Sequence, residues 1–560
     1  MMYSDKPWLK FYQKDVPETV TLNDITIPEI LELSANEFPN NNALNFQGFR
    51  LTYLELKDMV DRFASYLKAS GVKKGDSVAV LLPNVIPAIV SYYAILKAGG
   101  VVVMNNPLYS DRELKHQFND SGSKILITLD LLADRMIRLR PETGIGKIVY
   151  TSIGDYLPFP KSLLFPLVGK KKGLAAKVLP ATELYRWKDV LKTSQPITNP
   201  PEISLGDPAL YQYTGGTTGV SKGVILTHGN VANQVKQVDA WFPTLKKGLE
   251  TGLAALPVFH VFGMTIAMNW QVFNAWEMIL VPKPEPDALI DAITKFKPTV
   301  TSLVPTMIIG ILNHPESSNI DLSSIKGCFS GSAPLPVEVI KEFEEKTGAV
   351  IVEGFGLSEA SPVTHINPFS ASARKVGSIG IPLPSTECRI VDLEDSSKAA
   401  ETGEPGELLI KGPQVMRGYL GLEKETNNTL KDGWLHTGDV AIMDDDGYFF
   451  IVDRIKDMVI SGGYNVYPRE IDEVVYEHPK VAEACAVGIP HPSRGEQVKL
   501  FVVLKEGETT TADEMIAFCA DKLAKYKLPT QVEFRTELPK TNIGKILRKD
   551  LRAEEMQDRS

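Results

Sequence analysis

The hydrophobic pattern of the first 150 residues alternates between helical spacing and the short apolar runs of buried strands. Apolar residues between 56 and 67 recur at helical spacing, and Gly71 is expected to end that helix. Apolar runs at 78–82, 101–104 and 124–128 predict buried strands. Because strands that alternate with helices form parallel sheets covered on both faces, the predicted fold class is α/β.

A second pattern begins beyond residue 370, where turn residues become more frequent. The segments 403–412 and 444–454 indicate strands joined by glycine turns. The charged segment 453–457 follows an apolar strand, so we place the main domain boundary there, which leaves roughly 100 residues for a small α+β domain. The length of 560 residues agrees with two domains, because single hydrophobic cores stop growing at about 250–300 residues.

Composition and charge exclude several classes of protein. The 43% hydrophobic and 23% charged residues are typical of globular proteins. A net charge of −9 argues against a nucleic-acid partner, because phosphate backbones require clustered Lys and Arg. The four cysteines form no Cys-x-x-Cys pair, which suits a reducing compartment and offers no metal framework. No run reaches about 18 apolar residues and no signal peptide is recognisable, so we expect a cytoplasmic protein that spans no membrane.

Residues 151–197 interrupt the alternation by mixing apolar residues with lysines. One interpretation is a surface excursion between two strands. The other is an interfacial segment in peripheral contact with anionic lipid, where basic and apolar residues occur together. Pro158, Pro160 and Pro166 argue against a single clean helix and so weaken the second interpretation. The lysines are Lys161, Lys170, Lys171, Lys172 and Lys177.

The strongest local signal is the segment YTGGTTGVSKGV at 213–224. Glycines let backbone N–H groups approach phosphate oxygens, and the hydroxyls and the lysine supply further donors. The segment is not a Walker A loop, and composition alone favours a mobile Gly/Thr linker equally. The candidate phosphate-binding residues are Tyr213, Thr214, Gly215, Gly216, Thr217, Thr218, Gly219 and Lys222.

This segment resembles the phosphate-binding signature of the adenylate-forming superfamily, which includes acyl-CoA synthetases, peptide-synthetase adenylation domains and firefly luciferase. Four further segments resemble motifs of the superfamily and occur in its order, namely 354–359, 434–439, 453–457 and 539–545. The likeness covers nearly the whole chain. The runs 382–392 and 432–457 are most similar to long-chain fatty acyl-CoA synthetases.

The resemblance implies an architecture and a reaction. The expected architecture is an N-terminal domain at 1–453, of stacked α/β sheets with a small β-barrel-like subdomain, then a hinge at 454–457 and a mobile C-terminal domain at 458–560. In the implied reaction a fatty acid carboxylate attacks ATP to give acyl-AMP and pyrophosphate. Coenzyme A thiolate then displaces AMP to give the acyl-CoA. ATP and coenzyme A are therefore co-substrates, and Mg²⁺ is the expected cofactor.

The resemblance also implies roles for single residues. Glu359 would hold Mg²⁺, which prefers carboxylate and phosphate oxygens. Lys545 would stabilise the charge that develops at the α-phosphate, and His260 would orient the acyl carboxylate. Asp439 would accept hydrogen bonds from the ribose hydroxyls, with Arg454 assisting.

The remaining assignments follow the same motifs. Ser358 would contact the α-phosphate, and Lys456 would be the hinge residue. Gly462 and Gly463 would line the pantetheine tunnel, where only a small residue lets a thin chain pass. The adenine slot is assigned to Gly331, Ser332, Ala333, Pro334, Gly354, Phe355 and Gly356.

The sequence disfavours one class of substrate and leaves several enzyme classes open. No acidic residue lies between Pro257 and Trp270, where amino-acid-activating relatives place an Asp, and this absence disfavours an amino-acid substrate. Aliphatic residues near Val261, Met264 and Ile308 favour a fatty acid. Coumarate-type aryl-CoA ligases, medium-chain synthetases and acyl-AMP ligases are rivals within the superfamily. A luciferase-like oxygenase and a non-catalytic lipid-binding relative represent other classes, and a homodimer is an open alternative for the assembly.

Overall fold

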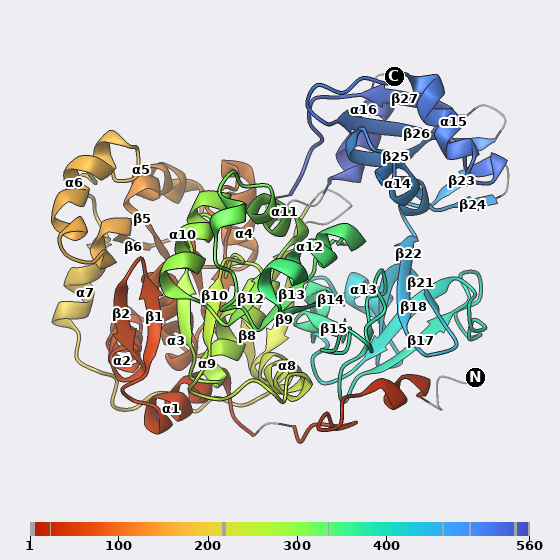
Figure 1. Cartoon of the computed structure of the whole chain (residues 1–560). Coiled ribbons are helices and arrows are strands. Elements are labelled where there is room, and N and C mark those ends of the chain that lie inside the picture. The colour runs from red at the N-terminus through yellow and green to blue at the C-terminus, as the bar shows by residue number, and fades with distance from the viewer. Residues whose placement is uncertain are drawn as a thin grey trace. The chain divides into compact units, whose positions relative to one another are not determined.

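The computed structural model describes residues 6–22, 24–214, 220–333, 335–461, 464–491, 494–541 and 546–557 (Figure 1). The chain groups into two compact units. The larger unit contains Leu9–Glu387 and Lys411–Leu435, and the smaller contains Cys388–Ile410 and His436–Ser560 with the start of the chain up to Trp8. The predicted α/β class, with a large N-terminal and a smaller C-terminal part, is confirmed. The boundary at 453 and the hinge at 454–457 stay predictions.

The first sheet of the larger unit has nine strands in the order β16-β15-β14-β13-β12-β10-β11-β1-β2. Its inner pairs, from β14 to β1, are parallel, and both edges are antiparallel. The bounds are β1 (Asn42–Phe46), β2 (Phe49–Thr52), β10 (Thr251–Ala254), β11 (Glu277–Leu280), β12 (Val300–Leu303), β13 (Gly327–Ser330), β14 (Val350–Gly356), β15 (Val363–Ile366) and β16 (Ile381–Pro382).

The second sheet has eight strands in the order β19-β9-β8-β4-β3-β5-β6-β7. The run from β8 to β7 is parallel, whereas β9 pairs antiparallel with both β8 and β19. The bounds are β3 (Ser77–Leu81), β4 (Val101–Met104), β5 (Ile125–Leu129), β6 (Lys147–Thr151), β7 (Leu184–Arg186), β8 (Pro208–Thr214), β9 (Lys222–Thr227) and β19 (Gly418–Tyr419).

Helices pack against these sheets, and the early predictions agree with them. The predicted helix at 56–67 is part of α2, which begins after a capping box between Thr52 and Glu55 and ends before Gly71. The predicted strands correspond to β3, β4 and β5. The helices are α1 (Ile27–Glu37), α2 (Tyr53–Ala69), α3 (Ile86–Lys97), α4 (Asp111–Asp120), α5 (Asp130–Leu139), α6 (Lys161–Lys171), α7 (Trp187–Thr193), α8 (His228–Trp241), α9 (Trp270–Phe273), α10 (Pro286–Phe296), α11 (Pro305–Leu312), α12 (Val337–Thr347) and α13 (Glu423–Thr429).

Helix α3 has no polar face. Every residue from Ile86 to Leu96 is buried. A helix that is apolar all round belongs in the interior. Two tyrosines of α3 join a buried hydrogen-bond chain, in which Tyr93 donates to Asn269 and Asn269 donates to Tyr92. The helix is therefore part of the core of the larger unit.

Within 151–197, the stretch between β6 and β7 forms an excursion that contains the 3-10 helix η4 (Ile153–Tyr156) and α6, and α7 follows β7. The expectation that the prolines argue against a single helix was wrong for α6, which continues through Pro166. Pro158 and Pro160 instead precede the helix, where proline is tolerated.

Two further sheets have five strands each, and most of their strands belong to the smaller unit. In one, β17 (Glu387–Val391), β18 (Gly406–Lys411), β21 (Trp434–Met443) and β20 (Leu430–Lys431) follow one another, and β22 (Phe449–Arg454) pairs with β21. In the other, the order is β24 (Tyr464–Val466), β23 (Val459–Ser461), β26 (Gly495–Leu504) and β25 (Val481–His491), and β27 (Gln531–Phe534) pairs with β26. The helices of the smaller unit are α14 (Pro468–Tyr476), α15 (Ala512–Ala520) and α16 (Arg548–Gln557).

Candidate active site

The two ends of the predicted phosphate-binding loop are held together by strand pairing. Strands β8 and β9 form an antiparallel hairpin in which Thr214 is opposite Lys222. Residues 215–219, which include five of the predicted phosphate ligands, lie outside the described residues. The hairpin thus fixes where the loop leaves and re-enters the sheet.

Tyr213, the residue before this turn, is anchored to α4. Its ring is buried and lies edge-on to His116, and its hydroxyl donates to Asp120 Oδ2 at 2.7 Å. Burial and the Asp120 carboxylate raise the pKa of Tyr213, so the phenol stays protonated. On the other side of the loop, His116 Nε2 donates to the Ser221 carbonyl at 2.9 Å. Helix α4 therefore supports both ends of the loop.

Glu359 lies in a cluster with Lys222 and Tyr419. The Tyr419 hydroxyl donates to Glu359 Oε1 at 2.8 Å, and Lys222 Nζ lies 5.0 Å from the centre of the Tyr419 ring. Burial and the Glu359 carboxylate raise the pKa of Tyr419, which keeps the phenol a donor. Among the described residues, no side chain is recorded as a donor to Glu359 Oε2.

Sequence reasoning missed Tyr419, and no local pattern marks it. It reaches Glu359 because β19 pairs with β9, which places Tyr419 opposite Val224. The backbone adds two hydrogen bonds, from Met416 N to Glu359 O at 2.7 Å and from Leu420 N to Gly223 O at 2.8 Å. The contact between Tyr419 and Glu359 joins residues far apart in the sequence, so only the pairing of β19 with β9 reveals it.

The glycines of the predicted adenine slot are required by close packing. A Cβ atom on Gly354 would lie 2.5 Å from the Phe329 ring, and one on Gly356 would lie 2.3 Å from the Pro362 carbonyl oxygen. A Cβ on Gly331 would lie 3.3 Å from the Gly354 carbonyl oxygen, so the two predicted segments are neighbours at the ends of β13 and β14. Pro334 lies outside the described residues.

Of the three other described residues of the slot, Ser332 and Ala333 follow β13 and Phe355 lies in β14. Ser332 has a φ of 75°, in the left-handed region that non-glycine residues rarely adopt. The Phe355 ring is half-buried and lies edge-on to His365. Ala333 is exposed, and Ser358 is half-buried at the start of a short 3-10 helix, η7 (Ser358–Ala360).

The segment that carries His260 is clamped by Asn84. The buried Asn84 amide donates to the Ala254 and Leu256 carbonyls at 2.9 and 2.8 Å, and its oxygen accepts Val258 N–H at 2.9 Å. Burial lowers the pKa of His260 to about 4, so its ring is neutral near pH 7. Since Nδ1 accepts the Phe262 N–H at 3.3 Å, the ring proton is on Nε2, which is then a donor.

A π-helix, η5 (Gly263–Asn269), follows His260, and all seven of its residues are buried. Such helices are rare and often occur at functional sites. Met264 lies on this segment and Val261 just before it, and both side chains are buried. Trp270 instead packs against Phe242 and Trp276. Ile308 belongs to the core formed with α10 and α12.

The smaller unit brings together the two residues predicted to bind ribose. Asp439 on β21 is opposite Arg454 on β22, and Arg454 Nε lies 3.0 Å from Asp439 Oδ1. Glu407, which sequence reasoning missed, accepts the Gly438 N–H at 3.1 Å and pairs with His436 Nδ1 at 2.8 Å. The part of β21 before Asp439 is thereby fixed to β18.

The residues around the predicted hinge are bound by the last helix. Arg552 on α16 donates to the Lys456 carbonyl at 3.3 Å, and Arg548 lies 3.5 Å from Asp453 and also pairs with Asp472. Gly462 and Gly463, like Lys545, lie outside the described residues. The ends of the segment with Lys545 meet in a bridge between Lys540 and Ile546.

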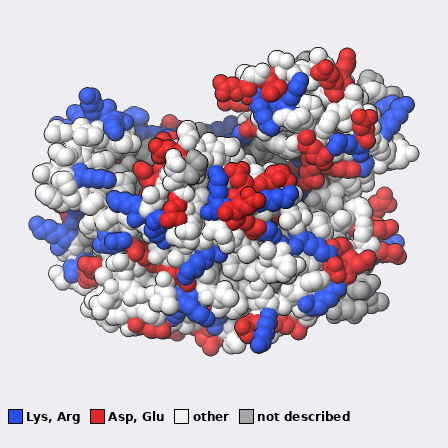
Figure 2. All heavy atoms as spheres, viewed as in Figure 1, with Lys and Arg blue, Asp and Glu red and all other residues white. Residues whose placement is uncertain are grey.

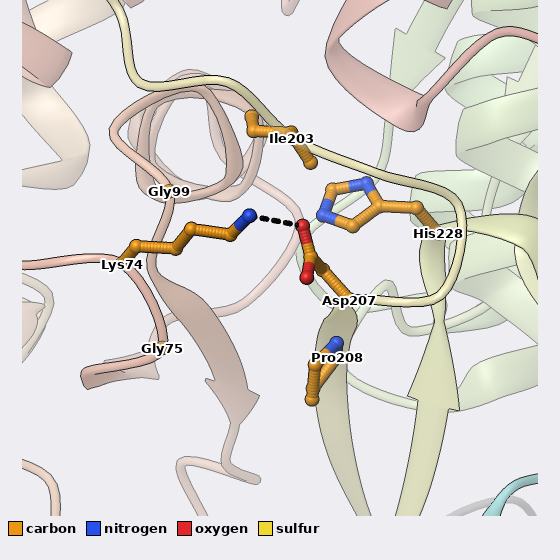
Figure 3. A pocket seen from close by; sticks show the side chains of 7 residues that line it. All are labelled: Lys74, Gly75, Gly99, Ile203, Asp207, Pro208 and His228. Atoms are coloured by element: carbon orange, nitrogen blue, oxygen red, sulfur yellow. Dashed lines mark ion pairs between the residues drawn. The ribbon is translucent and has the colours of Figure 1, made fainter.

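A small cavity of about 40 Å³ lies at the other end of β8 from this site (Figure 3). Lys74 and Asp207 form an ion pair of 2.7 Å in its wall, and the buried His228 borders it. Pro208 begins β8 and Thr214 ends it, so roughly 20 Å separate the cavity from the glycine loop. A cavity of this size has room for about one water molecule and takes no substrate.

Within the described ranges, no three His, Cys, Asp or Glu residues gather as a metal-ligand set. No helix among them is long and apolar enough to cross a bilayer.

Comparisons with known proteins agree with the fold and the motifs. The sequence profile of AMP-binding enzymes matches residues 31–420, and that of the AMP-binding enzyme C-terminal domain matches 470–545. The chain therefore belongs to the AMP-binding enzyme family.

Two relatives and one solved structure are similar over the whole chain. The chain is 46% identical to a long-chain-fatty-acid–CoA ligase of Bacillus subtilis, over 100% of this chain and 99% of the relative. It is 39% identical to the ligase of the same name from Salmonella typhimurium, over 98% of each chain. The crystal structure of an anthranilate CoA ligase in complex with anthranoyl-AMP superposes with a TM-score of 0.84 at 25% identity, over 100% of both chains.

Proposed function

We propose that the protein is a long-chain fatty acid–CoA ligase that releases AMP. The observation that carries this proposal is the 46% identity over the full chain to a ligase of that name. In the first half-reaction a carboxylate oxygen bonds to the α-phosphorus of ATP, and pyrophosphate leaves. In the second, the thiolate of coenzyme A bonds to the acyl carbonyl carbon, and AMP leaves.

The glycine loop at 215–219 and Lys222 are the proposed ligands of the triphosphate, together with Ser358. Mg²⁺ bound there would neutralise phosphate charge during adenylation. Glu359 fits such an ion, because Tyr419 occupies only one of its oxygens. Tyr419 is thus a positioning residue that orients the carboxylate.

His260 is proposed to donate from Nε2 to the fatty acid carboxylate. Its lowered pKa supports this role, because a neutral donor orients the nucleophile without neutralising it. Val261 and Met264 would contact the acyl chain, which gains about 0.8 kcal/mol for each methylene buried. Asn84 would keep the imidazole in place.

The remaining roles belong to the nucleotide and to coenzyme A. Asp439, held by Arg454, would accept the ribose hydroxyls, and 331–334 with 354–356 would enclose the adenine. Lys545 would stabilise charge at the α-phosphate, Gly462 and Gly463 would admit pantetheine, and Lys456 would be the hinge. We also propose a cytoplasmic enzyme in peripheral contact with membrane through 151–197, with the homodimer as an alternative assembly.

A substrate panel assayed by AMP release tests the proposal. Fatty acids of about eight carbons or more should have the highest kcat/KM, rising roughly fourfold per added methylene until the pocket is filled. A higher kcat/KM for coumarate, benzoate or anthranilate would replace the proposal by an aryl-CoA ligase. Oxygen consumption coupled to acyl-AMP would indicate the oxygenase instead.

A further inference from the structure

Helix α6 presents an apolar surface that the described chain leaves uncovered. Leu163 and Leu167 are 71% and 78% exposed, and Phe159, just before the helix, is 83% exposed. Leu164 and Val168 are exposed as well, and Gly169 is the one buried residue of α6. Soluble proteins seldom leave such a contiguous apolar face open unless it binds something.

The opposite side of α6 explains how the helix is held. Ser162, Phe165 and Gly169 are its less exposed residues, at the spacing of one helical face. The Phe165 ring lies against η4 so closely that a Cβ on Gly154 would be 2.3 Å from it. The Phe165 face of the helix therefore packs against η4, and the leucines lie on its other side.

The charged residues around the exposed apolar face of α6 are all basic. The segment 156–182 contains five lysines and no acidic residue, in a chain whose net charge is −9. Lys161 precedes the leucines and Lys170, Lys171 and Lys172 follow them, all exposed. Figure 2 shows basic spheres around a mostly white surface at the upper left, where Figure 1 labels α5 and α6.

We propose that α6 lies in the plane of an anionic lipid surface, with its leucines among the acyl chains and its lysines at the headgroups. Lysine stems allow this arrangement, because they can extend along the apolar layer while the ammonium stays in water. At 1.5 Å per residue its 11 residues span only about 16 Å, too short to cross a bilayer. A second copy of this chain fits less well, since it would bring the same lysines together.

The biological benefit of lipid docking rests on the proposed function as a fatty acid–CoA ligase. Long-chain fatty acids partition into membranes, so a ligase docked on the bilayer would take its substrate where that substrate is concentrated. The docking itself depends only on α6 and can be measured without turnover.

Cosedimentation of the full chain with vesicles tests the proposal. The protein should bind vesicles of phosphatidylcholine with 30% phosphatidylglycerol, and bind those of phosphatidylcholine alone far less. The triple variant K170Q/K171Q/K172Q should weaken binding roughly fivefold per lysine, and L163Q/L164Q/L167Q by tenfold or more. The matched control L54Q/L108Q/L249Q changes three other exposed leucines of the same unit and should bind like the parent.

The outcomes separate docking from function. Release of AMP from an eight-carbon acid in solution should be unchanged in every variant, because α6 takes no part in the chemistry. A parent chain that turns over this acid but ignores anionic vesicles overturns the docking and leaves the ligase. Vesicle binding without ligase activity would support the docking and overturn the proposed ligase. Equal binding by all three triple variants, or binding that 0.5 M salt does not weaken, would also reject α6 as the lipid contact.

Discussion

At the scale of single residues, the cluster of Glu359 with its neighbours shows how little of a site is visible in local motifs. Glu359 could be predicted because it stands in a recognisable motif. Its partner Tyr419 could not, because the contact depends on β19 joining β9. Glu407 was missed for the same reason, since it supports Gly438 from a different strand.

Tyr419→Phe should reduce kcat/KM for ATP by roughly tenfold and leave the KM of the fatty acid unchanged. The change removes a hydrogen bond to a charged group, which is worth about 1.5 kcal/mol, and leaves the ring under Lys222 in place. Initial rates at varied ATP and magnesium measure the effect.

Tyr185→Phe is the control, because it removes a tyrosine–glutamate hydrogen bond of 2.9 Å outside the site. Equal losses in the two variants would mean that Tyr419 only supports the fold.

Lys545→Ala should slow adenylation by about 10²–10³-fold, the scale for losing one electrostatic stabiliser. The second half-reaction should be largely spared, because charge at the α-phosphate develops during adenylation. Thioester formation from synthetic acyl-AMP and coenzyme A measures that half, with Lys549→Ala as the control. If the mutant fails equally in both halves, Lys545 has a different role.

At the scale of elements, the regular parts of the chain were the most predictable. Helix α2 and strands β3, β4 and β5 follow directly from hydrophobic spacing, and the structure adds a capping box at Thr52. The π-helix η5 was not predicted, because all seven of its residues are buried and no solvent-facing side marks it in the sequence. The expectation that prolines prevent a helix was wrong for α6. Pro158 and Pro160 precede this helix, and Pro166 lies within it.

Gly356→Ala should destabilise the protein by about 1–3 kcal/mol and lower kcat/KM for ATP. The new Cβ would lie 2.3 Å from the Pro362 carbonyl, so the hairpin of β14 and β15 must shift and displace 354–359 with it. Thermal unfolding and initial rates measure the two effects.

Gly206→Ala supplies the comparison, because a Cβ there meets nothing within 4 Å. An unchanged melting temperature for Gly356→Ala would show that β15 can shift to make room for the Cβ without loss of stability.

At the scale of the whole molecule, the predicted two-step reaction requires the C-terminal residues to serve adenylation and thioester formation in turn. Lys545 and Gly463 both follow Lys456 in the chain, and a single placement would have to satisfy both. We expect rotation at Lys456 to resolve this conflict. The contacts of Arg548 with Asp453 and of Arg552 with the Lys456 carbonyl would have to change during that rotation.

Lys456→Pro should leave adenylation nearly intact and slow thioester formation by orders of magnitude. Proline fixes φ near −65° and restricts the preceding residue, and no described acceptor receives the Lys456 N–H. Stopped-flow measurement of each half-reaction, with a thermal melt, checks this. Equal slowing of both halves would place the hinge elsewhere.

The position of Asn84 has a consequence for how the larger unit unfolds. Asn84 follows β3 of the eight-stranded sheet, yet its amide binds carbonyls at the end of β10 in the nine-stranded sheet. The buried chain from Tyr93 through Asn269 to Tyr92 links α3 to η5 in the same way. Separating the two sheets would break these buried hydrogen bonds together. The two sheets should therefore melt as one cooperative block, and the segment with His260 should persist until the whole block is lost.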